Sequence, residues 1–213
     1  TGASNTAVGN NALRANTTAS NNTAVGYQAG YSNTTGGQNV AISKALYSNT
    51  TGNDNIGIGF ASLNFNTSGA SNVAIGRDSL KANTTASHNV AVGYQALLDN
   101  TTGNNCIAIG SGALANNTSA ANNIAIGTDA LITNTTGSEN TAIGRLALTA
   151  NTTGTNNSAF AYGALDSNTT GTNNIAIGRD ALAANTTASS NTAIGYQSYY
   201  DNTTGAANVG VGY

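Results

Sequence analysis

The sequence has little of what most catalytic, metal-binding or membrane-inserted proteins use. Its 213 residues include no proline, methionine or tryptophan, one cysteine, one histidine and only 7% charged residues. One cysteine excludes an internal disulfide framework, and one cysteine with one histidine makes a multi-ligand zinc site improbable. A net charge of −2 gives no electrostatic footprint for nucleic acid or an anionic membrane. We therefore predict a protein that is not an enzyme, with no cofactor, no metal, no nucleic-acid partner and no membrane insertion.

Large apolar residues are also scarce. Val, Ile, Leu and Phe together supply 36 positions, whereas Asn supplies 35 and Thr 32. A strongly charged chain with so few apolar residues would be expected to stay disordered, but this chain is hardly charged. No apolar run approaches the roughly 18 residues of a membrane span. The composition therefore needs another explanation, which the order of the residues supplies.

A repeat of 17 residues runs through the whole chain. The segment Asn-Thr-Ala-Val-Gly at 5–9 recurs, and its first residue defines repeat position 1. Position 1 falls at Asn5, Asn22, Asn39, Asn55, Asn72, Asn89, Cys106, Asn123, Asn140, Asn157, Asn174, Asn191 and Asn208. Every interval is 17 residues except the one from Asn39 to Asn55, where one residue is missing from the turn that follows the first strand. No linker interrupts the copies, so we predict one repeat array over residues 1–213.

A second constant segment, Asn-Thr-Thr or Asn-Thr-Ser, occurs once in each repeat. Its asparagine stands at position 12, which is occupied by Asn16, Asn33, Asn49, Asn66, Asn83, Asn100, Asn117, Asn134, Asn151, Asn168, Asn185 and Asn202. Asn and the Gly that often follows accept left-handed backbone conformations, and Thr hydroxyls bond nearby backbone groups. The segment is therefore typical of a turn.

The first half of the repeat predicts a short β-strand. Position 3 is always Ala or Gly, whereas position 4 is always a large apolar residue such as Val8 or Ile75. Neighbouring side chains of a strand point to opposite sides, so positions 2 and 4 share one side and position 3 meets a close neighbour on the other. Ala or Ser followed by Leu at positions 8 and 9, as in Ala12-Leu13, predicts a second short strand.

These elements predict an all-β fold, a parallel β-solenoid of about twelve 17-residue coils. The apolar runs are too short for stable helices. Coils stacked at roughly 4.8 Å give a rod about 58 Å long, in which asparagines can form an amide ladder and Val/Ile an apolar spine. Arg77, Arg145 and Arg179 share one column but never occupy successive coils, which avoids a run of like charges.

The predicted coil is slender, and chain association would add the apolar burial that one coil lacks. We therefore expect a homotrimer or homopolymer. The ends show no obvious capping unit and the initiator methionine is absent, so we expect a segment of a longer fibre.

The strand motif has a counterpart in known proteins. The units at 72–76 (Asn-Val-Ala-Ile-Gly) and 174–178 (Asn-Ile-Ala-Ile-Gly), with the Ala/Ser-Leu that follows, resemble the head repeats of YadA-like trimeric autotransporter adhesins. They are more similar still to 17-residue repeat arrays of phage tail-fibre-like proteins. The resemblance covers essentially the whole chain, although the adhesin heads use a shorter coil. It implies a left-handed β-roll, three chains wound about one axis and a role in surface attachment.

Candidate contact residues follow the strand at position 6. An outward row of aromatic and Arg side chains could bind sugars or a partner surface, or could simply shield the turns and keep the rod soluble. The row comprises Tyr27, Phe60, Arg77, Tyr94, Arg145, Tyr162, Arg179, Tyr196 and Tyr213. A second outward group, Tyr31, Tyr47, Tyr199 and Tyr200, has the same two interpretations.

The position 12 asparagines also match the N-glycosylation sequon, so each is a possible glycan site. The same residues suit a turn with an internal amide ladder, and a buried asparagine cannot accept a glycan; we favour the turn. The Thr columns raise ice binding as a further hypothesis, which alternation along the strand disfavours because adjacent Thr residues point opposite ways. Cys106 is interpreted as a buried free thiol, and His88 as a turn residue without a second ligand.

The leading hypothesis is thus a structural and adhesive rod of a phage tail fibre or bacterial surface adhesin, located outside the cell or on a virion. Its partner would be a cell-surface glycan or another host receptor. The alternatives are a self-assembling extracellular filament and an ice-binding solenoid.

Overall fold

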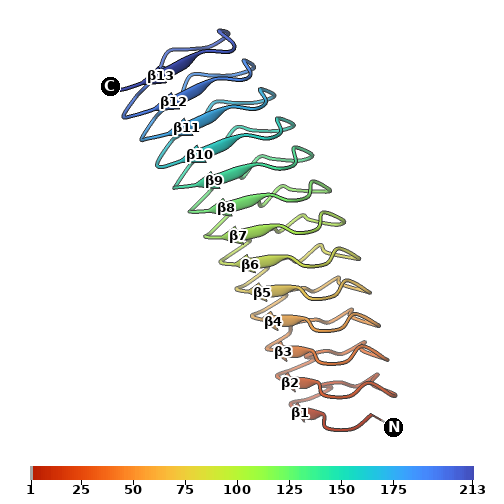
Figure 1. Ribbon diagram of the computed structural model, residues 1–213. Helices are drawn as coiled ribbons and strands as arrows, with labels where there is room; N and C mark the ends of the chain where they lie inside the picture. Colours follow the sequence, from red (N-terminus) through yellow and green to blue (C-terminus); the bar gives the residue numbers. More distant parts are fainter. Residues whose placement is uncertain (1) are drawn as a thin grey trace.

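The computed structural model describes residues 2–213, and that part of the chain forms a rod of stacked coils without a helix. Each coil contributes one three-residue strand, and the strands pair in chain order in one parallel sheet (Figure 1). They are β1 (Thr6–Val8), β2 (Thr23–Val25), β3 (Val40–Ile42), β4 (Ile56–Ile58), β5 (Val73–Ile75), β6 (Val90–Val92), β7 (Ile107–Ile109), β8 (Ile124–Ile126), β9 (Thr141–Ile143), β10 (Ser158–Phe160), β11 (Ile175–Ile177), β12 (Thr192–Ile194) and β13 (Val209–Val211). The predicted parallel β-solenoid is confirmed.

The pairing register equals the sequence repeat. Ala7 pairs with Ala24 in the first ladder, and Ala41 pairs with Gly57 across the 16-residue coil. From the next coil, the Gly59 N–H donates to the Ile42 carbonyl of the short coil, and the Ala61 N–H donates to its Lys44 carbonyl. Lys44 therefore occupies position 6 and the missing residue is position 7, within the predicted turn.

The predicted second strand at positions 8 and 9 is wrong. Leu97 at position 9 has a φ of 52° and Gln95 at position 7 a φ of 56°, and equivalent residues repeat these values along the rod. Two left-handed residues two positions apart bend the chain, so it cannot take up the pleat of a strand. Neighbouring coils still bond here, since the Leu97 N–H donates to the Ala113 carbonyl at 3.0 Å. The segment is a stack of identical turns.

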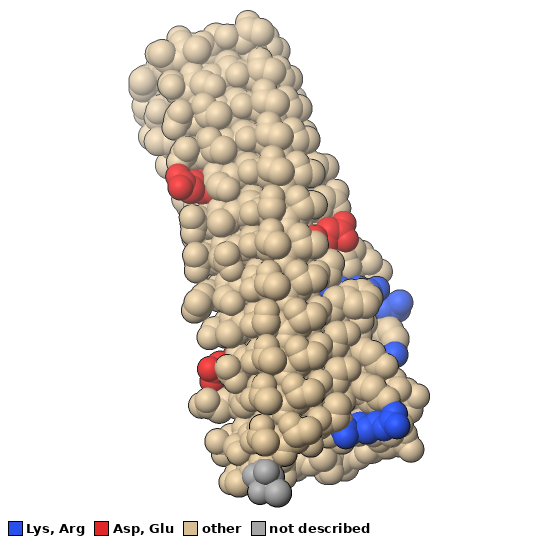
Figure 2. All heavy atoms as spheres, turned by 90° about the vertical axis from the view of Figure 1, so that its right-hand side faces the viewer, with Lys and Arg blue, Asp and Glu red and all other residues tan. Residues whose placement is uncertain are grey.

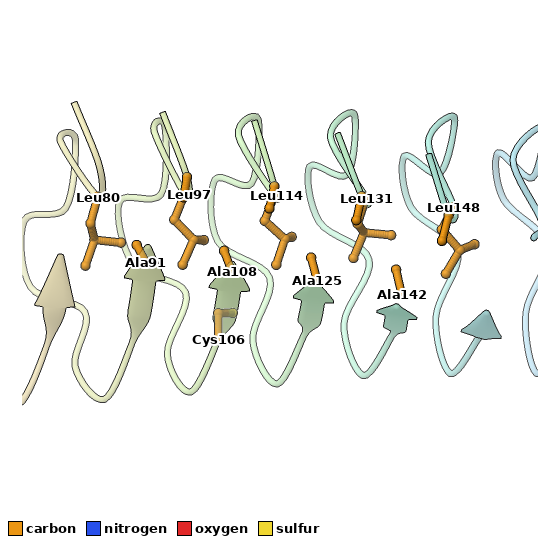
Figure 3. Packing of buried hydrophobic residues seen from close by; sticks show 14 of the residues in the cluster. Leu80, Ala91, Leu97, Cys106, Ala108, Leu114, Ala125, Leu131, Ala142 and Leu148 are labelled. Carbon is orange, nitrogen blue, oxygen red and sulfur yellow. The ribbon is translucent and has the colours of Figure 1, made fainter. Parts of the chain in front are cut away.

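The left-handed leucines point inward and form the core. Leu97 and Leu114 are fully buried, and they pack against Ala91 and Ala108 of the strands on the opposite wall (Figure 3). A small side chain at position 3 is needed because the Leu column fills the space between the walls. The Leu column is therefore buried within the single chain, whereas Val and Ile at position 4 point outward.

Two asparagine columns complete the interior and confirm the predicted amide ladder. In the position 12 column, Asn151 Nδ2 donates to Asn134 Oδ1 at 2.9 Å and to the Gly154 carbonyl at 3.0 Å. In the position 1 column, the Asn157 N–H donates to Asn140 Oδ1 at 3.0 Å. No buried side-chain nitrogen or oxygen of the described residues lacks a hydrogen-bond partner. The rod can therefore bury polar groups where an ordinary small domain would need apolar ones.

Candidate functional site

The sheet presents a largely apolar surface to the outside. Side chains at positions 2 and 4 of all thirteen strands lie on the side away from the Leu column, and we call this surface the sheet face. Ile109 and Ile177 are 39% and 40% exposed, although each is flanked by strands above and below. Position 2 holds Thr or Ser in β1, β2, β9, β10 and β12, but position 4 stacks Val, Ile or Phe over the length of the rod. Soluble monomers rarely expose such a column.

Side-chain volume on the sheet face is balanced within one coil. Strand β10 carries Phe160, the one aromatic residue at position 4, and the same strand carries Ser158, the one serine at position 2. A large side chain beside a small one keeps the face level. An uncovered surface has no need of a constant volume, so this pairing favours a face that packs against a neighbour.

The position 6 row lies at the edge of the sheet face, and all eight predicted contact residues in it are exposed: Tyr27, Phe60, Arg77, Tyr94, Arg145, Tyr162, Arg179 and Tyr196. The guanidinium carbons of Arg145 and Arg179 lie 5.8 Å and 5.3 Å from the centroid of the Tyr162 ring. Tyr196 stacks on Tyr213 with a centroid distance of 5.5 Å. These ring faces are therefore occupied by neighbours, and a ligand would meet ring edges, phenol hydroxyls and guanidinium N–H groups.

Carboxylates accompany the cations of this row. Arg179 Nε donates to Asp180 Oδ2 at 3.2 Å, and Asp78 binds both Arg77 Nε at 3.2 Å and Lys81 Nζ at 3.0 Å. Asp166 stands at position 10, outside this row; burial raises the pKa of its carboxyl, and hydrogen bonds from Ser167 partly offset the increase. Of the position 6 arginines, only Arg145 forms no ion pair within the described chain.

The second outward group separates into two columns. Tyr31, Tyr47 and Tyr200 stand at position 10, whereas Tyr199 takes the place of Leu at position 9, and its hydroxyl donates to the Val209 carbonyl at 3.3 Å. Tyr31 and Tyr47 stack face to face, with ring centroids 5.0 Å apart. Arg14 and Lys44 cap this pair, a feature that sequence reasoning missed because Lys44 reaches Tyr47 from another column.

The Asn-Thr-Thr edge is built from the ladder and carries few charges (Figure 2). Ten of the twelve position 12 asparagines, Asn33 to Asn185, are buried, and the Nδ2 hydrogens of a residue such as Asn151 are both engaged. A glycan on this nitrogen would need the space that the next coil fills. Glycosylation of these asparagines stays a prediction that the folded geometry disfavours.

The two Thr columns of this edge differ in their hydrogen bonding. At position 13, Thr101 Oγ1 donates to the Thr118 carbonyl of the next coil at 2.9 Å, and Thr152 bonds Thr169 in the same way. At position 14 the side chains are exposed, as at Thr102. Of these two Thr columns, only the position 14 hydroxyls are thus left to face water. The edge therefore does not offer the flat two-column lattice that the ice-binding hypothesis needs.

The Leu column is interrupted at Gly30, and a cavity of about 10 Å³ lies there between Leu13 and Leu46. The cavity is lined by residues of the first three coils, including Ala41. It has about the volume of one water molecule, which is too small for an organic ligand. The cavity is therefore a packing defect.

Cys106 interrupts the position 1 ladder. The thiol is buried, and its Sγ lies 3.4 Å from the Ala120 carbonyl that an asparagine amide would bind. Burial raises the pKa of the Cys106 thiol, an effect that backbone hydrogen bonds from Asn123 and Asn122 reduce. Elsewhere in this column the position 1 N–H donates to an amide oxygen, but the Asn123 N–H faces sulfur.

Replacing Cys106 with Asn should therefore stabilise the rod. The new amide would offer Oδ1 to the Asn123 N–H and Nδ2 to the Ala120 carbonyl, and we expect a gain of about 1 kcal/mol in the free energy of unfolding. Urea unfolding followed by circular dichroism measures it. Cys106→Ala is the matched control, because it removes sulfur and restores no bond. An Asn variant no more stable than the Ala variant would contradict the ladder geometry.

Other kinds of site find little support in residues 2–213. That part of the chain contains no group of three His, Cys, Asp or Glu side chains placed to hold a metal ion. His88 is exposed in its turn. None of the described segments is a helix long and apolar enough to cross a membrane.

Comparison with protein-family models, with curated proteins and with solved structures finds no match to this chain. The features of this chain that indicate a function are the sheet face, the position 6 row and the tyrosines at position 10.

Proposed function

We propose that the chain is a structural rod rather than an enzyme, a homotrimer that attaches a tail fibre or surface adhesin to its target outside the cell. The observation that carries the proposal is the sheet face, an apolar surface that runs the length of the rod. Three copies placed around one axis would cover it along its whole length. The trimeric number and a left-handed winding rest on the resemblance to adhesin head repeats.

In-register packing of parallel copies accounts for the balanced volumes on β10. Chains related by an axis along the rod meet at equal heights, so Phe160 would lie beside the same residue and beside Ser158 of its neighbours. A small partner at that height leaves room for three aromatic rings. The remaining faces would stay free, and identical surfaces repeated around the axis add avidity to weak contacts.

The mass in solution tests the proposal. Sedimentation equilibrium of the unmodified chain should give three times the 21.0 kDa chain mass, without growth on raising the concentration. The paired variant Ile109→Glu and Ile143→Glu should lower the mass to one chain while circular dichroism keeps its β signal. Both residues are partly exposed in the single chain, but charges at a shared axis would repel across the interface.

The matched control places the same charges on the Asn-Thr-Thr edge. Thr102→Glu with Thr136→Glu should leave the mass at three chains, since both side chains are exposed away from the sheet face. A single-chain mass for the unmodified protein would refute the trimer. Mass that keeps rising with concentration would favour the filament instead.

A further inference from the structure

The rod is electrically asymmetric along its length. Residues 1–98 hold four basic and two acidic side chains, a net of +2, and residues 99–213 hold two basic and six acidic ones, a net of −4; the sum is the −2 of the chain. No acidic residue precedes Asp54. Figure 2 shows basic side chains along one flank of the lower half, which is the N-terminal half. The first three coils therefore carry uncompensated positive charge.

That charge belongs to one continuous assembly, which we call the cation–tyrosine stack: Arg14, Tyr31, Tyr47 and Lys44. The Arg14 guanidinium carbon lies 5.4 Å from the Tyr31 centroid, the two rings are 5.0 Å apart with planes 10° from parallel, and Lys44 Nζ lies 5.0 Å from the Tyr47 centroid. Arg14 also donates a hydrogen bond to the Tyr31 hydroxyl. Stacking fixes long side chains that would otherwise be mobile, so less entropy is lost when a ligand binds them.

The stack keeps unused hydrogen-bond donors. Neither Arg14 nor Lys44 forms an ion pair with a described residue, in contrast to Arg77, Lys81 and Arg179. The Tyr47 hydroxyl has no hydrogen-bond partner within residues 2–213. Guanidinium, ammonium and phenol groups in one row are donors suited to carboxylate and sugar hydroxyl oxygens.

The length of the stack favours a polymer over a single small ligand. Arg14 and Lys44 lie at the two ends of the stack, so their charged groups are further apart than the two strand spacings that separate their coils. A linear glycan that carries carboxylates at intervals along its chain can reach both cations, and the Tyr hydroxyls between the cations face its uncharged sugars.

Nucleic acid fits less well on two counts. Single strands bind aromatic side chains through open ring faces, but the facing sides of Tyr31 and Tyr47 are stacked and cations lie over both rings. Duplex DNA carries one charge for about 1.7 Å of axis, and two free cations neutralise little of it.

We propose that the cation–tyrosine stack binds a linear acidic polysaccharide, with its carboxylates at Arg14 and Lys44 and its chain along the rod axis. The site deepens the proposed attachment function, on which it rests, by naming the chemical class of the target. Arg14 and both tyrosines stand at position 10, on the wall opposite the strands, and Lys44 stands at position 6, at the edge of the sheet face. Other copies can therefore cover the sheet face while Arg14 and the rings stay open.

Binding is tested on the full chain with hyaluronan oligosaccharides as the acidic probe, dextran as the neutral probe and an oligodeoxythymidylate as the nucleic-acid probe. We expect hyaluronan to bind more tightly than either other probe, and to weaken as salt is raised. Arg14→Gln with Lys44→Gln should reduce hyaluronan affinity roughly tenfold or more, which corresponds to about 1.4 kcal/mol. Arg14→Lys should retain most of the affinity because it keeps the charge.

Arg145→Gln with Arg179→Gln is the matched control, since it removes two exposed cations that are also two coils apart and also flank a tyrosine. It should leave hyaluronan affinity within about twofold. Equal binding of dextran, tighter binding of the oligonucleotide, or equal losses in the two double variants would each overturn the proposal. Sedimentation on the same samples separates the two ideas, because a trimer that ignores hyaluronan refutes only the stack, and a monomer that binds it refutes only the trimer.

Discussion

Replacing Asn151 with Asp should destabilise the folded rod by about 3 kcal/mol or more at neutral pH, although the two side chains have nearly the same shape. Asn151 is fully buried, donates twice through Nδ2 and accepts from Asn168 Nδ2 at 2.9 Å. A carboxylate keeps the acceptor but turns both donors into acceptors. The negatively charged carboxylate would then face Asn134 Oδ1 and the Gly154 carbonyl oxygen, with no cation nearby.

The loss should depend on pH in a defined direction. Burial without a compensating cation raises the folded-state pKa of the new carboxyl above its unfolded value. As pH falls through that raised pKa, the folded chain takes up a proton that the unfolded chain does not yet bind, so stability recovers as pH falls and is lost again as it rises. Urea unfolding at a series of pH values, with the original protein beside it, measures the difference.

Asn156→Asp is the control for the same chemical change. Asn156 is exposed at position 17, a column that already carries Asp54 and Glu139. We expect a change within about 0.5 kcal/mol. Equal losses at Asn151 and Asn156 would show that the amide ladder contributes nothing specific to stability.

Replacing Gly110 with Val should destabilise the rod by about 3 kcal/mol, or prevent folding. Gly110 has a φ of 132°, and a Cβ there would lie 2.5 Å from the Gly127 carbonyl oxygen of the next coil. The coil spacing is fixed by backbone hydrogen bonds on both sides, so the contact cannot be relieved by moving the coils apart. Thermal unfolding followed by circular dichroism gives the loss.

Ala161 supplies the graded comparison for this position. It stands at position 5 with a φ of 104°, lower than that of the neighbouring glycines. Gly110→Ala should therefore cost less than Gly110→Val, and Ala161→Gly should cost little or stabilise, because glycine adopts a positive φ without strain. A valine variant as stable as the alanine variant would show that the turn is looser than its contacts indicate.

The strand, its register and the asparagine ladder could be predicted from the sequence because each depends on a residue repeated at one position. Alternation of Ala at position 3 with Val or Ile at position 4 defines two faces, and a strict period defines the stacking. The φ angle of a repeated residue cannot be inferred from its residue type in the same way. Leucine rarely adopts a φ near 50°, so the sequence predicts a strand at Ala12-Leu13 where the structure has a turn, and it does not predict that the Leu column points inward.

The candidate surfaces were predicted only in part. The outward position of Tyr94 and Arg145 follows from their place after the strand. The contacts of outward side chains do not follow from the sequence. A contact such as that of Lys44 with Tyr47 joins two columns of one coil and depends on how a turn folds. The covering of Tyr162 by guanidinium groups also needs the coil spacing and the side-chain directions together.

The direction of the hydrogen bonds also has a mechanical consequence. In every coil, backbone and asparagine bonds join one coil to the next along the rod, as between Asn134, Asn151 and Asn168. A tensile load applied at the two ends would therefore act on the coils in series, and each junction would bear the full force. A rod loaded in this way would yield at its weakest junction first and lengthen by one coil at a time, so it would absorb a sudden pull by stepwise extension.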